Sequence, residues 1–292
     1  MSRPALLSLA FLGLHPDQCT DLLERFGSPE AVLRAAGRGS VGPDARRLVK
    51  SASECAASLA DLGVEFDIRG DPAFPPELAG LPDAPHWLFR RGAIPFGPAV
   101  AIVGTRRCTE YGRRLAFGFG AACARAGWTV VSGLARGIDG AAHLGAIDGG
   151  GFGVAVLGCG SDVVYPREHA GMLDMILRGA GAVVTEYPPG TPPQGWRFPP
   201  RNRIISGLAR AVVVVESAVT GGSLGTAARA LEQGRYVFAV PGDVDREASV
   251  GCNLLIRDGA TPILGVDDLV EALSLVLGPP AGPTAGADPS GR

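Results

Sequence analysis

Four short stretches carry glycine and hydroxyl residues, and three of them also carry arginine. They are VGTRRCTEYG at 103–112, SGLARGID at 132–139, FPPRNRIISG at 198–207 and TGGSLGT at 220–226. Glycine lets backbone N–H groups approach an anion closely, and a guanidinium adds paired donors with a permanent charge. These residue types therefore indicate phosphate binding.

The stretches lack the residues that two common kinds of phosphate site require, those for a dinucleotide and for a P-loop nucleotide. A dinucleotide site needs G-x-G-x-x-G and, about 20 residues later, an acid for the ribose. Here Gly104 is followed by Thr-Arg-Arg, and the next apolar run ends at Ser132. A P-loop needs a lysine, and Lys50, far upstream, is the only lysine in the chain. A row of anion sites suits a polyanion better than one small phosphate.

Composition limits the function further. With 292 residues, 46% of them hydrophobic, the chain can bury the core of one large domain with a small companion, or the cores of two domains. The formal net charge of -2 gives no global signal for nucleic acid, so a charged site must be local. Because no stretch could span a bilayer and no cleavage-like site follows the N-terminus, we expect a cytoplasmic protein without a membrane partner. The six cysteines form no C-x-x-C pair and predict neither a metal site nor disulfides.

The segment from residue 99 alternates short β-branched runs with helical stretches. The runs are AVAIVG, WTVVSG, FGVAVLG, GAVVTEY, AVVVVES, YVFAVPG and TPILG. Apolar strands separated by helices predict an α/β fold with a doubly wound, mostly parallel sheet. In such sheets ligands bind beyond the carboxyl ends of the strands, where the four stretches lie.

Other segments flank this sheet. Residues 1–64 are predicted to form a small helical domain, with one continuous helix across 43–63. A helical pair there could touch the DNA backbone, although plain packing is the favoured interpretation. A Pro-rich connector is expected at 65–98, the sheet domain at 99–277, and a disordered tail or linker at 278–292.

Some of the polar residues also have purely structural interpretations. Asp139 and His143 are spaced i, i+4 and could form a metal or acid–base pair. Without a third ligand, an N-cap aspartate and a packed histidine are favoured. Tyr165 could stack on a base or pack against the sheet edge, and Arg107 is interpreted as a solvated surface charge.

The arginines of FPPRNR have a structural alternative of the same kind. Arg201 and Arg203 could be ion-paired with Glu186 or Glu216, which end neighbouring apolar runs. Both interpretations stay open from the sequence alone.

Seven motifs occur in a fixed order along the chain. They are VGTRRCTEYG, VVSGLARGIDGAAH, AVLGCGSDVVYP, TEYPPGTPP, FPPRNRIISGLA, VVVVESAVTGGSLGTA, and ALEQGRYVFAVPGD through GCNLLIRDGA. Together, over about residues 66–265, they closely resemble the DNA-processing protein A family, DprA, also called Smf. The resemblance implies an extended Rossmann-like domain behind a small helical domain of sterile-alpha-motif type, and a homodimer. It also implies a non-enzymatic, cofactor-free protein that binds single-stranded DNA without sequence preference, protects it, and loads the RecA recombinase during natural transformation.

The resemblance also assigns a DNA-binding edge, residue by residue. Its members are Gly104, Thr105, Arg106, Ser132, Gly133, Arg136, Arg201, Asn202, Arg203, Gly222 and Ser223. The chain departs from the family in two ways. The usual Ser-Gly-Ser-Leu is Gly-Gly-Ser-Leu at 221–224, which removes one hydroxyl. Many relatives carry a C-terminal winged helix, whereas this chain stops in a Gly/Pro-rich tail, so that module is expected to be absent or to have been cut away.

Two other functions compete with this one. The lysine-decarboxylase-like nucleotide phosphoribohydrolases share a Rossmann-like core and a P-G-G-x-G-T-x-x-E signature. Here TGGSLGTAARALE has an extra residue between its glycines, and Glu232 lies six residues past Thr226 instead of three. The second competitor is a regulator that binds a small nucleotide without catalysis.

Overall fold

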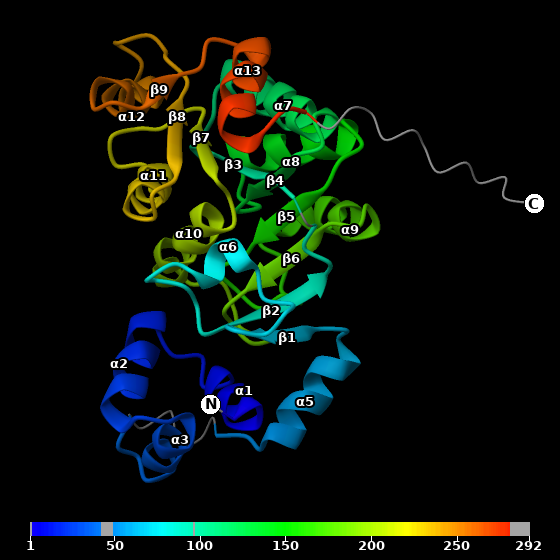
Figure 1. Ribbon diagram of the computed structural model, residues 1–292, viewed down its shortest axis with the longest axis vertical. Helices are drawn as coiled ribbons and strands as arrows, with labels where there is room; N and C mark the ends of the chain where they lie inside the picture. Colours follow the sequence, from blue (N-terminus) through cyan, green and yellow to red (C-terminus); the bar gives the residue numbers. More distant parts are fainter. Residues whose placement is uncertain (1, 42–48, 96, 281–292) are drawn as a thin grey trace, which may run out of the picture.

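A nine-stranded sheet runs through the molecule in the order β1-β2-β6-β5-β4-β3-β7-β8-β9 (Figure 1). The computed structural model describes residues 2–41, 49–95 and 97–280. The parallel strands are β3 (Ala99–Val103), β4 (Thr129–Ser132), β5 (Gly153–Val156), β6 (Ala182–Thr185), β7 (Ala211–Val214), β8 (Tyr236–Ala239) and β9 (Thr261–Pro262). They coincide with the seven predicted runs, and the predicted doubly wound α/β fold is confirmed.

Helices cover both faces of this sheet (Figure 1). One face carries α7 (Glu110–Arg125), α8 (Ile138–Asp148), α9 (Ala170–Arg178) and α13 (Val266–Leu277). The other carries α6 (Pro76–Ala79), α10 (Phe198–Gly207), α11 (Gly222–Glu232) and α12 (Glu247–Arg257). Alternate residues of a strand point to opposite faces of the sheet. In β3, Val100 and Ile102 pack against the helices of the first face, and Ala101 and Val103 against those of the second. No helix in the described part of the chain is long and apolar enough to cross a membrane.

The N-terminal helices pack on the antiparallel edge of the sheet. They are α1 (Arg3–Ala10), α2 (Pro16–Phe26), α3 (Pro29–Gly37) and α5 (Ala52–Asp61), and the edge strands are β1 (Glu65–Ile68) and β2 (Trp87–Gly92). Their common core includes Phe66, Trp87 and Phe89. The segment that the sequence predicts as a connector therefore holds two strands that the sequence patterns do not reveal, while the domain boundaries themselves stay predictions.

The single helix predicted across 43–63 is wrong in its extent. Residues 49–51 are not helical, and α5 begins at Ala52 because Ser51 and Glu54 form a capping box that starts a helix there. Residues 42–48 lie outside the described residues, as does most of the predicted tail, 281–292.

The sheet has one topological switch point. From β3 the chain winds outward through β4, β5 and β6, then returns to place β7 on the other side of β3. The loops after β3 and β7 therefore diverge to opposite faces, which leaves a crevice at their carboxyl ends.

Candidate nucleic-acid interface

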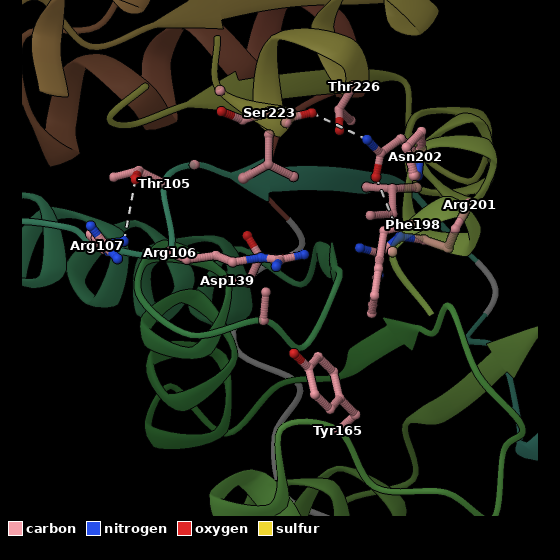
Figure 2. A pocket seen from close by; sticks show the side chains of 18 of the residues that line it. Thr105, Arg106, Arg107, Asp139, Tyr165, Phe198, Arg201, Asn202, Ser223 and Thr226 are labelled. Atoms are coloured by element: carbon pink, nitrogen blue, oxygen red, sulfur yellow. Dashed lines mark hydrogen bonds between the residues drawn. The ribbon is translucent and has the colours of Figure 1, made fainter. Parts of the chain in front are cut away.

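A cleft of about 600 Å³ opens at this switch point (Figure 2). It is lined by the loop after β3, the segment leading into α8, and the first turns of α10 and α11. All four stretches that the sequence singled out contribute lining residues. Among the predicted site residues, those lining the cleft are Gly104, Thr105, Arg106, Arg201, Asn202, Gly222 and Ser223.

Arg106 is an exposed cation at the mouth of the cleft. Figure 2 shows its side chain reaching inward from the β3–α7 loop. Its guanidinium carbon lies 5.1 Å from the centre of the Phe198 ring, and the Tyr165 ring lies 5.6 Å from the same ring. Cation–π attraction holds the guanidinium against Phe198. The mouth therefore combines a positive charge with two aromatic rings.

The β3–α7 loop is fixed by the end of β7. Thr105 donates its backbone N–H to the Glu216 carbonyl at 2.7 Å, and Thr109 donates its N–H and its hydroxyl to the Glu216 carboxylate at 2.8 and 2.5 Å. Gly104 is required at this approach, because a Cβ there would lie 2.5 Å from Ile138 Cγ1. Glu216 thus holds this loop in place rather than pairing with an arginine, a role that sequence reasoning missed.

Helix α11 presents a free N-terminus to the cleft. None of the described side chains caps it, and its N-cap residue is Gly221. Asn202 anchors the turn by donating its side-chain N–H to the Gly222 carbonyl at 3.1 Å. The Ser223 hydroxyl donates inward to Ser217 Oγ at 2.8 Å. The turn therefore offers backbone N–H groups and a partial positive charge to an anion.

Arg201 and Asp139 form the buried floor of the cleft. Arg201 donates to the carbonyls of Gly133, at 2.9 Å, and of Val156, which bridges the ends of β4 and β5. Burial lowers the pKa of Arg201 to about 10, so it stays charged at neutral pH. Asp139 accepts the Gly133 N–H at 3.1 Å, and burial raises the pKa of its carboxyl group. Both side chains therefore shape the loop after β4.

Helical geometry separates the FPPRNR residues. Phe198, Arg201 and Asn202 are spaced i, i+3, i+4 and all line the cleft. Arg203 does not line it: both of its terminal nitrogens donate to the Glu186 carboxylate at 2.6 Å, and its Nε donates to the Asp83 carbonyl at 2.8 Å. The structure therefore does not bring Arg203 to the other predicted site residues.

Three more predicted residues lie beside or behind the cleft. Ser132 is fully buried, and its hydroxyl donates to the Ile102 carbonyl at 2.6 Å. Gly133 and Arg136 line a small side pocket of about 20 Å³ that shares Arg106 with the cleft. Arg136 is exposed and donates to the carboxylate of Glu168.

Three residues outside the predicted DNA-binding edge also line the cleft. Arg107 is exposed, as expected of a solvated charge, but it lies at the cleft, and its backbone N–H donates to Thr105 Oγ1 at 3.2 Å. Phe198 was not singled out, although its i, i+4 spacing to Asn202 could have placed it on the same face. Tyr165 packs on Phe198 and also lines the cleft, while its stacking on a base stays a prediction.

The interpretation of Asp139 as an N-cap is wrong, because the N-cap of α8 is Gly137, and Asp139 lies inside the first turn. Within the described ranges no group of three His, Cys, Asp or Glu side chains could hold a metal ion. Both ring nitrogens of the fully buried His143 lack a hydrogen-bond partner among the described residues. Burial lowers the pKa of this imidazole to about 4.

His143 should make the fold acid-sensitive. Below about pH 6.5 the unfolded chain protonates this imidazole while the folded chain resists until about pH 4, so the free energy of unfolding falls across that window. Between pH 7.5 and 5 we expect a loss of about 2 kcal/mol from this group. Urea unfolding of the native chain and of His143→Leu at both pH values tests this. An equal pH dependence in the two proteins would contradict it.

Residues 65–274 match the family model of DNA recombination-mediator protein A. Protein Smf of Escherichia coli is 43% identical over 206 residues, which are 70% of this chain and 55% of that protein. The putative DNA processing protein DprA of Mycobacterium tuberculosis is 48% identical over 173 residues, 59% of this chain and 44% of that protein. The chain thus spans about half the length of these two relatives.

Solved structures resemble the fold as well. The X-ray structure of DNA processing protein A from Streptococcus pneumoniae superposes with a TM-score of 0.77 and 30% identity, covering 93% of this chain and 98% of that one. A structure described for the single-stranded DNA binding mode of the Helicobacter pylori protein has a TM-score of 0.64 and 24% identity, covering 72% and 95%. The second likeness concerns the fold alone.

Proposed function

Because the chain belongs to the DNA recombination-mediator protein A family, DprA or Smf, we propose that it binds single-stranded DNA, without reading its sequence, in the cleft at the switch point. The observation that carries this proposal is the exposed Arg106 guanidinium against Phe198, on which Tyr165 also packs, in the same cleft as the uncapped start of α11. The Helicobacter pylori protein, which shares this fold, is described with a single-stranded DNA binding mode.

The two kinds of group suit the two parts of a nucleotide. Backbone N–H groups of α11 and the Arg106 guanidinium favour phosphate oxygens. The rings of Phe198 and Tyr165 offer faces on which any base can stack. Bases paired in a duplex cannot stack on these rings, so a single strand should bind better.

The wider role follows from family membership. We propose that the chain is not an enzyme, that it protects incoming single strands in the cytoplasm, and that it loads RecA onto them during natural transformation. We also propose a homodimer, since two clefts on one assembly would raise the avidity for a long strand.

The phosphoribohydrolase alternative is less well supported. Glu232 is the last residue of α11 and lies 2.7 Å from Arg229 at its own helix end. The cleft is at the other end of the helix, about 15 Å away along the axis. Among the described residues, one acid lines the cleft. It is the buried Asp139, whose carboxylate accepts a hydrogen bond from the Gly133 N–H.

A titration at two salt concentrations tests the proposal. An unstructured oligonucleotide, the matching duplex and AMP are each titrated with the native chain. Tightest binding of the single strand, weakening as salt rises, is the expected result. Equal affinity for the duplex, or release of adenine or ribose phosphate from AMP, would overturn it. AMP binding without turnover, together with no binding of the oligonucleotide, would favour the regulator.

Glu168 is expected to limit DNA affinity. Its carboxylate accepts from Arg136 at the edge of the side pocket, and both side chains are half exposed. Glu168→Gln should free Arg136 for a phosphate and remove a repelling charge. Affinity for the oligonucleotide should rise about threefold at low salt, with a steeper salt dependence.

A matched control for this change exists in the chain. Glu232→Gln removes the same charge from another exposed pair, with Arg229, at the far end of α11. It should leave the affinity close to native. An unchanged or lower affinity of Glu168→Gln would show that the Arg136 charge is not used for DNA.

A further inference from the structure

A short segment connects the cleft with the N-terminal helices. This rim segment, residues 192–197, includes the 3₁₀ turn η2 (Gly195–Arg197) and leads directly into Phe198. Its Pro193 and Gly195 line the cleft, and four of its residues are exposed. A segment with so little burial needs side-chain anchors to keep one shape.

Trp196 supplies the first anchor by contacting the N-terminal region. Its ring lies 5.3 Å from the imidazole of His15, the N-cap residue of α2, at an interplanar angle of 30°. Its indole N–H donates to Gln194 Oε1 at 2.8 Å. The contact therefore joins residues 181 positions apart, across the junction of the helical region and the sheet.

Arg197 supplies the second anchor from the sheet side. Its guanidinium carbon lies 4.6 Å from the Trp196 ring centre and 5.3 Å from that of Tyr187, and its Nη1 donates to the Pro192 carbonyl at 2.5 Å. Arg197 is buried. Trp196 thus contacts both an arginine of its own segment and a histidine of the N-terminal region.

We propose that the His15–Trp196 contact holds the rim segment in the shape that binds DNA, so that the N-terminal region positions the cleft without touching the strand. This inference rests on the proposed function. The face of α2 supports positioning over direct contact, since Asp17, Asp21 and Glu24 are exposed at i, i+4, i+7 and would repel phosphates. Loss of the contact lowers the fraction of molecules with a formed rim, and the apparent dissociation constant rises by the same factor.

Three variants test the proposal by oligonucleotide titration. His15→Asn keeps a side-chain acceptor for the Asp17 N–H but removes the ring, whereas His15→Phe keeps a ring. Trp196→Ala removes the other partner. We expect His15→Asn and Trp196→Ala each to weaken binding about fivefold, with an unchanged salt dependence, and His15→Phe to bind nearly as the native chain does. The double variant should be no weaker than either single one.

Acrylamide quenching of tryptophan fluorescence gives a readout that needs no DNA. Trp87 and Trp128 are buried and Trp196 is 41% exposed, so quenching reports mainly on Trp196. Quenching should be stronger in His15→Asn than in the native chain, and close to the native level in His15→Phe. Gln18→Ala, an exposed change on the same helix, should alter neither readout.

The outcomes separate the two hypotheses. Native affinity in His15→Asn would overturn the positioning role, and so would weaker binding in Trp196→Ala alone, which would mean that Trp196 touches DNA directly. If the native chain does not bind the oligonucleotide, the proposed function itself fails.

Discussion

Replacing Arg106 by alanine is expected to weaken binding of an unstructured single strand by at least about tenfold at low salt. The change removes the exposed charge at the mouth of the cleft and the cation that lies 5.1 Å from the Phe198 ring. Loss of one phosphate contact should also lower the slope of log affinity against log salt by about 0.7. Fluorescence anisotropy at several salt concentrations measures both quantities.

The control for Arg106 is an arginine of the neighbouring helix. Arg125 is exposed in the last turn of α7, whose first turn follows the Arg106 loop, so Arg125→Ala removes the same charge from the far end of that helix. It should leave both affinity and slope nearly native. Arg106→Lys should keep the slope but lose part of the affinity, because an ammonium cannot stack flat on Phe198. Equal effects of Arg106→Ala and Arg125→Ala would show that Arg106 contributes only through the general charge of the surface and makes no specific contact with DNA.

Replacing Gly222 by glutamate is expected to reduce single-strand binding by at least about thirtyfold. The residue is exposed at the first position of α11, and a Cβ there meets no described atom within 4 Å, so the fold has room for a side chain. The added carboxylate would lie where the N–H groups of the helix attract an anion. It would therefore compete with a DNA phosphate for these groups and repel it. The same titration measures this loss.

Gly222→Ala separates charge from bulk. Because the position is open and its φ is not in the left-handed region, alanine should be tolerated and binding should stay within about twofold of native. The thermal midpoint of Gly222→Glu should equal or exceed the native one, since an acid in the first turn stabilises a helix. Near-native DNA binding by Gly222→Glu would remove α11 from the proposed interface.

Much of the fold was predictable because its strands are buried on both faces. A strand such as β7, AVVV, is apolar at every position, and this continuous pattern predicts a parallel sheet. Strand β1, EFDI, alternates instead, and its neighbours are rich in proline. Its pairing with β2 across about twenty intervening residues is decided by tertiary packing, which a local pattern does not contain.

The site was predictable in its loops and less so in its side chains. Glycine and arginine at strand ends correctly indicated where a cleft would form. The partners of each arginine depended on contacts that are distant in sequence, as for Arg203 with Glu186 and for Arg136 with Glu168. The role of Glu216 could not be predicted for the same reason: its hydrogen-bond donor, Thr109, lies 107 residues away in the sequence.

The shared core of the N-terminal helices and the β1–β2 edge defines which part of the chain can be exchanged between relatives. Phe66, Trp87 and Phe89 pack against the helices, while β2 is hydrogen-bonded to β6 of the parallel sheet. In a chimera joined at residue 64, the helices of a relative would pack against the aromatic rings of this chain. Their side chains would not match these rings, and the mismatch would leave cavities or clashes. A chimera joined after Gly92 would carry helices and rings together, and would need only a backbone ladder to match its new host.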